Sequence, residues 1–600
     1  MNKLAETLPH WDVSQIYPDL ESPEFKSGFQ DTIQSITNLT ALFDEHQINR
    51  VDSQAVHGDT VAVLEMIIDH FNQTLTAVTT IRAYIFSFIA TDSRNAVAQA
   101  KLSELLPHMA KLNLLGTRLT AWVGSLDVEA LIAQSTTAAD HAYTLRKAKQ
   151  DALHLMSPVE EDLSAELILT GLISWQKLYS TYSSQIQVKI ELEGEVQILP
   201  LTAVQNLAYN RDRDIRARAY RAVLDTLADT AVPLAAALNA IKGETLALTK
   251  RRGWDSPLDM ALFENGLDRP TLDAMMAACR HAFPDFQRYL KTRARALRLP
   301  VLAWYDQLVP LGQGTQSWSY KDATQFIINQ FATYSPKMQQ IAQRAFAEDW
   351  LDAEPRDGKS GGAFCMSILP GESRILMNFE SGFTSVGTMA HELGHAYHNL
   401  NLAHRTPLQT ETPMALAETA STFCQKIVEN AALAKADAQD QMIIIDGLLE
   451  YATRVIVGAS SNFLFEQRLF EKRAQRELSV EELCALDIET QLETRGDALD
   501  PDLLHPYRWA YVPHYYRATF YNYPYIFGLL FGLGLYAQYQ ANPAVFREGY
   551  DDLLSSTGMG NAADLAARFG IDIRQPAFWD TSLDILRADI DRFEKLIIDR

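Results

Sequence analysis

Two histidines and the glutamate between them form the most chemically suggestive pattern in the chain. The stretch Thr388–His398 reads TMAHELGHAYH, which places the pattern H-E-x-x-H at His391, Glu392 and His395. On a helix, residues four apart lie on one face, so the two imidazoles can bind a single zinc ion. Glu392 would flank that ion and take a proton from a water on it. A buried helix with two hydrogen-bonded histidines is the alternative reading of this short pattern.

A zinc site of this kind needs a third protein ligand. The glycine and third histidine of the longer pattern H-E-x-x-H-x-x-G-x-x-H are absent, so the metzincin arrangement is excluded. Thr412-Pro413 is a strong helix start and predicts a helix over residues 413–433. Glu418 lies near its beginning among small apolar residues, where a carboxylate needs a partner such as a metal. We therefore expect His391, His395 and Glu418 to ligate zinc, with Glu411 and His398 outside the ligand set.

Aromatic residues gather later in the chain, over residues 509–525. Between Tyr511 and Tyr525 the sequence holds one histidine, His514, and six tyrosines. Such a stripe is usually core, but hydroxyl groups in this number must find partners or face a wet cleft. A zinc peptidase also needs donors for the oxyanion of its tetrahedral intermediate. His514 and Tyr521 are candidates for that role.

The elements that must position these residues are mostly helices. Segments rich in Ala, Leu, Glu and Gln, with apolar residues at a period near 3.6, predict long helices at Val61–Ile89, Asn95–Leu115 and Arg216–Lys250. The mixed charge run Arg211–Arg221 is typical of a solvated helix face. No internal repeat is visible.

Two short stretches predict strand pairs instead. Residues 185–199 alternate apolar and polar around Glu193-Gly194, which indicates a hairpin. A second pair, Ala363–Leu369 and Ile375–Phe379, is joined through Pro370-Gly371. The glycine-rich segment before that pair, residues 358–362, lacks the spacing of a phosphate-binding P-loop. It is either an ordinary loop or a place where the backbone closely approaches a ligand.

The sequence resembles oligoendopeptidase F, within the thimet oligopeptidase and neurolysin group of zinc peptidases. The matching segments span almost the whole chain: Trp11–Tyr17, Lys359–Cys365, Thr388–His398, Pro413–Ser421 and Pro513–Gly528. The resemblance implies a mainly α, two-lobed, zincin-like fold with a deep central channel and a small β element beside the active site. It implies one Zn2+ per chain on His391, His395 and Glu418, with Glu392 as the general base.

The resemblance also implies substrate-binding residues. The C-terminal histidine and tyrosine with which this family binds substrate map onto His514 and Tyr521. Tyr523 and Tyr525 are the alternatives to Tyr521 for the tyrosine position. A peptide would lie extended along the second strand pair, by strand addition. The residues expected to contact substrate there and in the aromatic cluster are Gly361, Gly362, Ala363, Phe364, Tyr515, Tyr523 and Tyr525.

Composition narrows the function classes. The chain has 600 residues with 53 Lys+Arg against 75 Asp+Glu, a formal net charge of −22, which argues against a nucleic-acid partner. No membrane segment or signal peptide is expected. The four scattered cysteines, Cys279, Cys365, Cys424 and Cys484, favour reduced thiols and a cytoplasmic location.

The sequence therefore predicts an oligopeptidase that cuts internal bonds of short unfolded peptides. The alternatives are a zinc carboxypeptidase, for which Arg508 or Arg517 would hold a terminal carboxylate, and a non-catalytic peptide-binding scaffold. A weak boundary near residue 200 divides an N-terminal helical region, 1–200, from a catalytic domain, 201–600. The sequence does not fix the oligomeric state.

Overall fold

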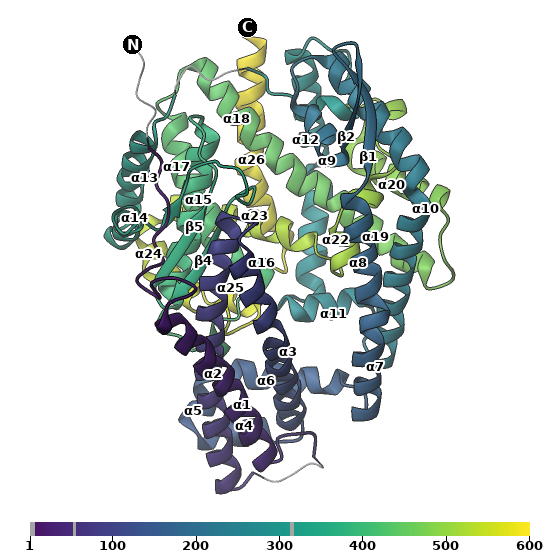
Figure 1. Ribbon diagram of the computed structural model, residues 1–600. Helices are drawn as coiled ribbons and strands as arrows, with labels where there is room; N and C mark the ends of the chain where they lie inside the picture. Colours follow the sequence, from purple (N-terminus) through teal and green to yellow (C-terminus); the bar gives the residue numbers. More distant parts are fainter. Residues whose placement is uncertain (1–6, 52–55, 313–316, 600) are drawn as a thin grey trace. The chain divides into compact units, whose positions relative to one another are not determined.

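A computed structural model describes residues 7–51, 56–312 and 317–599. Helices dominate these residues, and the named strands form two small sheets (Figure 1), which confirms the mainly α class. Two compact units are present, and each combines three separate segments. Unit 1 comprises Met1–Leu155, Gln316–Ala434 and Gln538–Leu565; unit 2 comprises Met156–Thr315, Lys435–Ala537 and Ala566–Arg600. The boundary near residue 200 and the central channel stay predictions.

Unit 1 begins with a helical region and continues with a mixed helix–sheet region. Its elements are α1 (Pro23–Glu45), α2 (Gly58–Thr91), α3 (Ala96–Gly124), α4 (Val128–Gln134), α5 (Thr136–Asp140), α6 (Ala142–Asp151), α13 (Tyr320–Tyr334), α14 (Pro336–Ala347), β3 (Leu351–Asp352), β4 (Phe364–Leu369), β5 (Glu372–Leu376), α15 (Phe383–Leu402), α16 (Met414–Ala417), α17 (Thr419–Leu433), α24 (Pro543–Ser555) and most of α25 (Ala562–Ala567).

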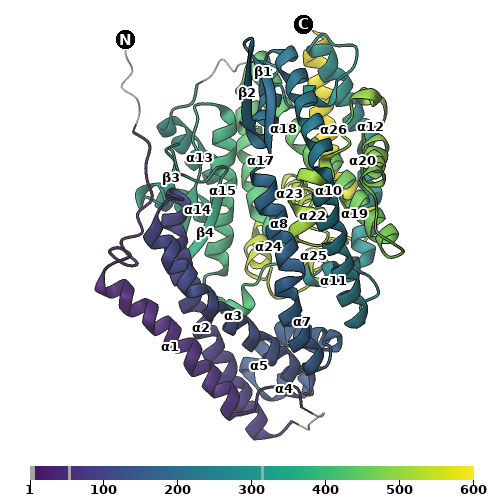
Figure 2. The same cartoon turned by 45° about the vertical axis from the view of Figure 1, so that its right-hand side comes forward.

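Helices α1, α2 and α3 pack side by side (Figure 2), and two of the three predicted helices fall within α2 and α3. By length and composition, α2 is the one helix in the described ranges that could cross a membrane; 44% of its apolar window is buried. Its buried residues include Ile67, Ile68 and Phe71, which pack with residues of α1 and α3. That packing is the behaviour of a core helix.

The sheet of unit 1 has the order β3-β5-β4, with β3 parallel and β4 antiparallel to β5. The register pairs Phe364 with Leu376 and Ser367 with Ser373, and Gly371 at φ +75° makes the turn between the strands. A strand pair joined at Pro370-Gly371 is thus confirmed, but its second strand is Glu372–Leu376 and not the predicted Ile375–Phe379. Helix α15 packs on β4 and β5 (Figure 1), so the sheet supports the helix that carries the H-E-x-x-H pattern.

The N-terminal motif that contributed to the resemblance is tied to this sheet. The amide of Asp12 donates to the carbonyl of Asp349 at 2.9 Å, and Nε of the buried Arg374 in β5 donates to the carbonyl of Asp12 at 2.7 Å. The rings of Trp11 and Phe364 meet edge to face, with centroids 6.4 Å apart. Trp11 and Asp12 therefore attach this segment to the sheet that supports α15.

Unit 2 is built almost entirely of helices. Its elements are α7 (Pro158–Thr170), α8 (Leu172–Ser184), β1 (Gln187–Leu192), β2 (Glu195–Pro200), α9 (Leu201–Gln205), the short helix η2 (Asn206–Tyr209), α10 (Arg213–Arg251), α11 (Pro257–Glu264), α12 (Arg269–Ala296), η3 (Trp304–Asp306), α18 (Ala438–Thr453), the π-helical turn η5 (Arg454–Gly458), α19 (Ala459–Arg473), α20 (Val480–Arg495), α21 (Arg508–Tyr511), α22 (His514–Arg517), α23 (Tyr523–Ala541) up to Ala537, and α26 (Pro576–Ile598).

The first predicted hairpin is also confirmed. Strands β1 and β2 pair antiparallel around Glu193 and Gly194, which have φ values of +54° and +82°. Positive φ at both central residues is the signature of a type I′ turn, which matches the twist of two-residue hairpins.

The mixed charge run needs a correction. It lies at the start of α10, as predicted, but Arg216 is 3% exposed and is not on a solvated face. Its guanidinium forms an ion pair with the fully buried Asp306 at 2.7 Å, and Arg213 pairs with the same carboxylate at 2.9 Å. A buried carboxylate 90 residues away in the chain overrides the local pattern.

Candidate metal centre and active site

Helix α15 presents the H-E-x-x-H residues as the sequence predicts. The rings of His391 and His395 lie one turn apart on one face, with centroids 5.0 Å apart. Glu392 is 5% exposed, and burial raises the pKa of its carboxyl group. One of its oxygens, Oε2, has no hydrogen-bond partner among the described residues. A buried, unsatisfied carboxylate oxygen is costly unless the site uses it.

Glycine at position 394 allows a second helix to approach α15 closely. A Cβ atom placed on Gly394 would lie 2.6 Å from Cα of Ser421 and 2.7 Å from the carbonyl oxygen of Ala420. Both are backbone atoms of α17, so no side-chain rotation could relieve the clash. The missing side chain thus lets the start of α17 reach the two histidines.

Glu418 lies at the junction between α16 and α17, and here the predicted continuous helix over 413–433 is wrong. The chain forms the single turn α16, breaks at Glu418, where φ is −87° and ψ is 6°, and starts again as α17. Thr412 does not cap the helix; its hydroxyl lies 2.9 Å from that of Thr557. The break turns the Glu418 carboxylate toward α15.

The carboxylate meets both imidazoles. Oε2 of Glu418 lies 3.1 Å from Nε2 of His391 and 3.4 Å from Nε2 of His395, and it accepts a hydrogen bond from the Ser421 hydroxyl at 2.6 Å. One ligand atom from each of the three residues falls within 4.8 Å of the others. Burial opposes ionisation of Glu418, but hydrogen bonds and charge from the two histidines win and lower its pKa.

A hydrogen-bond relay orients His391 for ligation. Nε2 of Gln425 donates to Oε1 of Glu429 at 2.7 Å, which turns the amide oxygen of Gln425 toward Nδ1 of His391, 2.9 Å away. An amide oxygen only accepts, so Nδ1 of His391 carries a proton, and in the neutral ring Nε2 is then the nitrogen left to ligate a metal ion. Metal-ligating histidines are held in this way.

These residues fit a divalent metal of the zinc type. Two imidazole nitrogens and one carboxylate oxygen are a donor set that zinc accepts in catalytic sites. They converge on one point, and the second ring nitrogen of His391 is already engaged.

His398 and Glu411, the two residues expected to lie outside the ligand set, have different environments. Nε2 of His398 lies 2.9 Å from the Thr557 hydroxyl, and burial together with His395 lowers the pKa of His398 to about 4. It is a hydrogen-bonded core histidine. Glu411 is exposed.

Lys359 fixes the glycine-rich segment before β4 through buried hydrogen bonds and an ion pair. The buried ammonium of Lys359 donates to the carbonyls of Asp352, Glu354 and Met377 and pairs with the Asp352 carboxylate at 2.7 Å. Gly361 and Gly362 are exposed, and Gly362 has a φ of +76°. Ala363 and Phe364 are half-buried and lead into β4 at the edge of the sheet.

The aromatic cluster of unit 2 gathers three of its predicted residues. The ring centroid of His514 lies 4.9 Å from that of Tyr521 and 5.9 Å from that of Tyr525, and the two tyrosines are 5.6 Å apart. All three are half-buried. Burial lowers the pKa of His514, against a hydrogen bond with Asn522.

Two other tyrosines of the cluster point into the core of unit 2. Tyr523 is fully buried, and its hydroxyl donates to the carbonyl of Ala261 at 2.9 Å. Tyr515 is 1% exposed and packs on Phe465. Their burial speaks against the predicted contact of Tyr515 and Tyr523 with substrate, and it leaves Tyr521 and Tyr525 as the candidate tyrosines.

Sequence reasoning missed the residues that hold this cluster in place. Phe520, directly before Tyr521, has a φ of +52°, which is unfavourable for a residue with a side chain. Its amide donates to Oε1 of Glu466 at 3.1 Å, and Glu466 pairs with Lys242 at 2.6 Å with both side chains buried. Single charges on the long helices α10 and α19 give no pattern by which sequence could pair them.

Comparison with known proteins identifies the family. The model of peptidase family M3 matches residues 206–585, more than half of the chain. The chain belongs to peptidase family M3. This M3 chain is 24% identical over 485 residues to an oligoendopeptidase F homolog of Lactococcus lactis subsp. lactis, covering 79% of this chain and 78% of that relative. It is 22% identical to oligopeptidase PepF of Bacillus subtilis, over 76% and 69% of the two chains.

Solved structures share the fold of this M3 chain. A putative peptidase from Chlamydophila abortus superposes with a TM-score of 0.83 at 20% identity over 99% of both chains. Oligoendopeptidase-F from Enterococcus faecium superposes with a TM-score of 0.69 at 15% identity, over 96% of this chain and 99% of that one. Family membership confirms that the chain is a metalloendopeptidase that acts on oligopeptides.

Proposed function

We propose that this M3 peptidase holds one Zn2+ per chain on His391, His395 and Glu418 and uses Glu392 as its general base. The convergence of Nε2, Nε2 and Oε2 within 4.8 Å carries the proposal. Zinc, when bound there, supplies Lewis acidity to the substrate carbonyl and to water.

Glu392 moves the protons in this proposal. Its carboxylate accepts a proton from the water that attacks the peptide carbonyl and then delivers that proton to the leaving amine. Burial supports both steps, because a raised pKa brings the carboxyl group closer to the operating pH. The unpartnered Oε2 atom is available to accept the proton.

The reaction also needs hydrogen-bond donors for the substrate and for the oxyanion. We assign His514 and Tyr521 to hydrogen bonds with the substrate and the developing oxyanion, with Tyr525 beside them. Gly361, Gly362, Ala363 and Phe364 would align an extended peptide along the edge strand β4.

The proposed substrates are short unfolded peptides, and the proposed compartment is the cytoplasm. Four cysteines without a disulfide are compatible with a reducing compartment. The acidic net charge of −22 disfavours nucleic-acid partners.

The test is mass-spectrometric mapping of the cuts that the purified protein makes in a mixed peptide library, with metal analysis of the same sample. We expect about one zinc per chain, cuts at internal bonds, loss of all cuts with a chelator and recovery with zinc. Removal of only C-terminal residues would indicate a carboxypeptidase instead. Cuts that persist after complete zinc removal would refute the metal site.

A further inference from the structure

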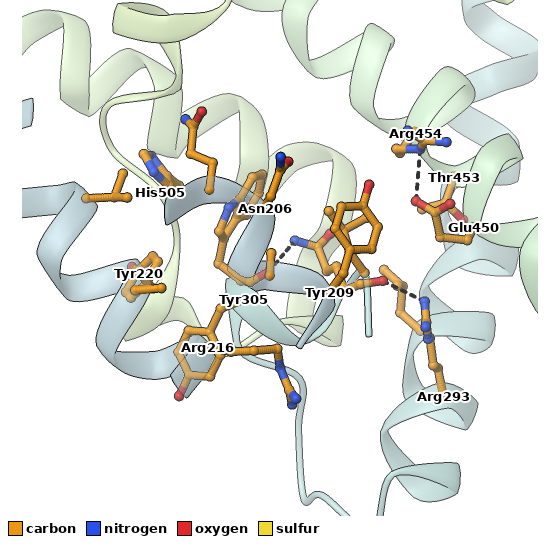
Figure 3. A pocket seen from close by; sticks show the side chains of 18 of the residues that line it. Asn206, Tyr209, Arg216, Tyr220, Arg293, Tyr305, Glu450, Thr453, Arg454 and His505 are labelled. Carbon is orange, nitrogen blue, oxygen red and sulfur yellow. Dashed lines mark hydrogen bonds and ion pairs between the residues drawn. The ribbon is translucent and has the colours of Figure 1, made fainter. Parts of the chain in front are cut away.

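A cavity of about 350 Å³ lies within unit 2, and its lining includes none of the residues assigned to catalysis above. Its walls come from η2 and α10, from α12 and η3, from α18 and η5, and from α20 and the segment that holds His505 and Tyr511. Figure 3 shows Tyr220 and His505 on one side and Glu450 and Arg454 on the other. Its size falls at the lower end of the range of about 300–1,000 Å³ for small-molecule sites.

One wall of the cavity is aromatic. Tyr220 lies with its ring centroid 5.3 Å from Tyr305 and 6.0 Å from His505, and Trp304 lies 5.8 Å from His505. Rings in these tilted and edge-on contacts offer a rigid surface to a flat or apolar group.

Three of the four arginines that line the cavity are already engaged. Arg216 pairs with Asp306 at 2.7 Å. Arg293 donates to the carbonyls of Gln307 and Val309 and lies 3.4 Å from the Asp446 carboxylate. The third, Arg454, pairs with Glu450 at 2.9 Å.

Arg495 is the exception. It is 5% exposed at the end of α20, and its guanidinium has only a 3.5 Å contact with Oε1 of Gln307 and a 3.2 Å bond to the hydroxyl of Thr494. No carboxylate of a described residue forms an ion pair with it. The carboxylate of Asp487, which attracts it from farther away, lies 3.4 Å from Arg508.

Beside the cavity, the two buried guanidinium groups of Arg495 and Arg508 thus have one buried carboxylate near them, that of Asp487. Both guanidinium groups lie over the ring of Trp304, at 5.3 Å for Arg495 and 5.4 Å for Arg508. Burial and the charge of Arg508 lower the pKa of Arg495 to about 9, so the charged form of Arg495 is short of partners. The carbonyls at the end of α20 and the indole ring stabilise it only in part.

We propose that this cavity is a second binding site, which takes a small organic carboxylate with an aromatic or apolar body. The carboxylate would accept a bidentate pair of hydrogen bonds from Arg495, and the body would rest on Trp304, Tyr220 and Tyr305.

The charge of the site favours a monoanion. Only one arginine is short of a carboxylate partner, and burial together with the charge of Arg508 lowers the pKa of His505 to about 3, so this histidine is neutral near pH 7. A phosphate dianion would find no second free cation in the described lining of the cavity.

The experiment is isothermal titration of the chelator-treated protein with N-acetyl-phenylalaninate and, separately, with the corresponding amide, which has the same shape without the charge. Metal removal prevents the carboxylate from ligating zinc. We expect the acid to bind and the amide to bind at least about tenfold more weakly, because the amide leaves a buried guanidinium unpaired. Equal binding of the two probes, or no binding of the acid at about 10 mM, would overturn the proposal.

Three variants locate the site. Arg495→Met should abolish the difference between acid and amide, and Trp304→Leu should weaken both probes. Arg288→Met removes the same charge from an exposed ion pair with Asp591 and should change neither. Retained discrimination in Arg495→Met would place the acid elsewhere and refute the assignment. The comparison of acid with amide uses the unaltered protein, so it remains decisive if a variant fails to fold.

Discussion

At the scale of single residues, Glu392 and Glu418 show how surroundings separate two carboxylates that are close in the fold. Burial raises the pKa of Glu392, whereas the two imidazoles lower that of Glu418. A raised pKa suits a group that exchanges protons, and a lowered pKa suits a permanent anion that ligates a metal.

Replacing the proposed base should separate catalysis from metal binding. We expect Glu392→Gln to keep zinc but to lower kcat by about 10²–10⁴-fold, because the ligands remain while the proton acceptor is lost. Kinetics on a quenched fluorescent peptide and metal analysis measure the two effects. The exposed Glu411→Gln is the matched control and should behave like the unaltered protein. Activity within about threefold of normal in Glu392→Gln would refute the role of this residue.

At the scale of elements, the metal centre depends on how closely α15 and α17 pack. Gly394→Ala would place a Cβ atom 2.6 Å from the backbone of Ser421 and force the helices apart. We expect a loss of about 1–3 kcal/mol in unfolding free energy together with weaker zinc binding.

Gly387→Ala on the same helix is the control for this prediction. Its nearest neighbour, Nε2 of Gln425, would be 3.9 Å from the new Cβ, so this substitution should be tolerated. Denaturant unfolding and competition with a zinc indicator are the measurements. If Gly394→Ala bound zinc as tightly as Gly387→Ala, the close approach would not be what brings Glu418 to the histidines.

The loop that carries Tyr521 depends on a buried ion pair between helices α10 and α19. Lys242→Met would leave the Glu466 carboxylate buried without its cation, which typically costs about 3–5 kcal/mol. We also expect kcat to fall, because Glu466 holds the amide of Phe520 in its left-handed conformation next to Tyr521.

Thermal unfolding and peptide kinetics test both effects of Lys242→Met. Lys250→Met, at the exposed end of the same helix, is the control. A variant that loses stability but keeps full kcat would show that the ion pair serves the fold alone.

Patterns that repeat along the chain made much of this architecture predictable. The apolar period near 3.6 predicts the long helices, and the turn dipeptides predict both hairpins. The four-residue spacing of His391 and His395 predicts that they lie on one helix face. The break at Glu418 was not predictable, because it depends on α15 lying against α17 through Gly394. Gln425, Arg495 and Lys242 were missed for a related reason: their partners come from other segments, and a single polar residue in a helix leaves no spacing to read.

At the scale of the whole molecule, two buried neutral histidines make the fold sensitive to acid. The folded pKa is about 4 for His398 and about 3 for His505, against about 6.5 for an unfolded histidine. The unfolded chain therefore binds more protons, so this stability is complete above about pH 6.5 and is lost as the pH falls through about 4 for His398 and about 3 for His505. The cost is about 1.4 kcal/mol for each pKa unit.

We expect urea unfolding to show a steep fall in stability between about pH 6.5 and pH 3. His505→Gln should make that fall shallower, since one of the two titrating groups is gone. An unchanged slope in this variant would mean that His505 does not remain neutral in the folded state.

The predicted central channel has a consequence for substrate choice. A substrate that must enter as one extended strand cannot be a folded protein unless a segment first unfolds, which takes several kcal/mol out of a typical total of about 5–15 kcal/mol. The test places one cleavable sequence in a short peptide, in a flexible loop of a folded carrier and in an unfolded full-length chain. We expect efficient cleavage of the short peptide only. Comparable rates on the carrier loop would argue for an open cleft.

Because unit 1 is built from three separate segments, it cannot complete its folding until the last of them has been synthesised. Its first segment ends at Leu155, but its last, Gln538–Leu565, is synthesised roughly 380 residues later. At a translation rate of about 5–20 residues per second, the last segment of unit 1 is synthesised roughly 20–80 s after the N-terminal helices. During that time α15 and α17 emerge and can meet, whereas Thr557, the partner of His398, is still missing. A nascent chain stalled before residue 538 should therefore remain protease-sensitive and hold chaperones, and release of the final segment should end both.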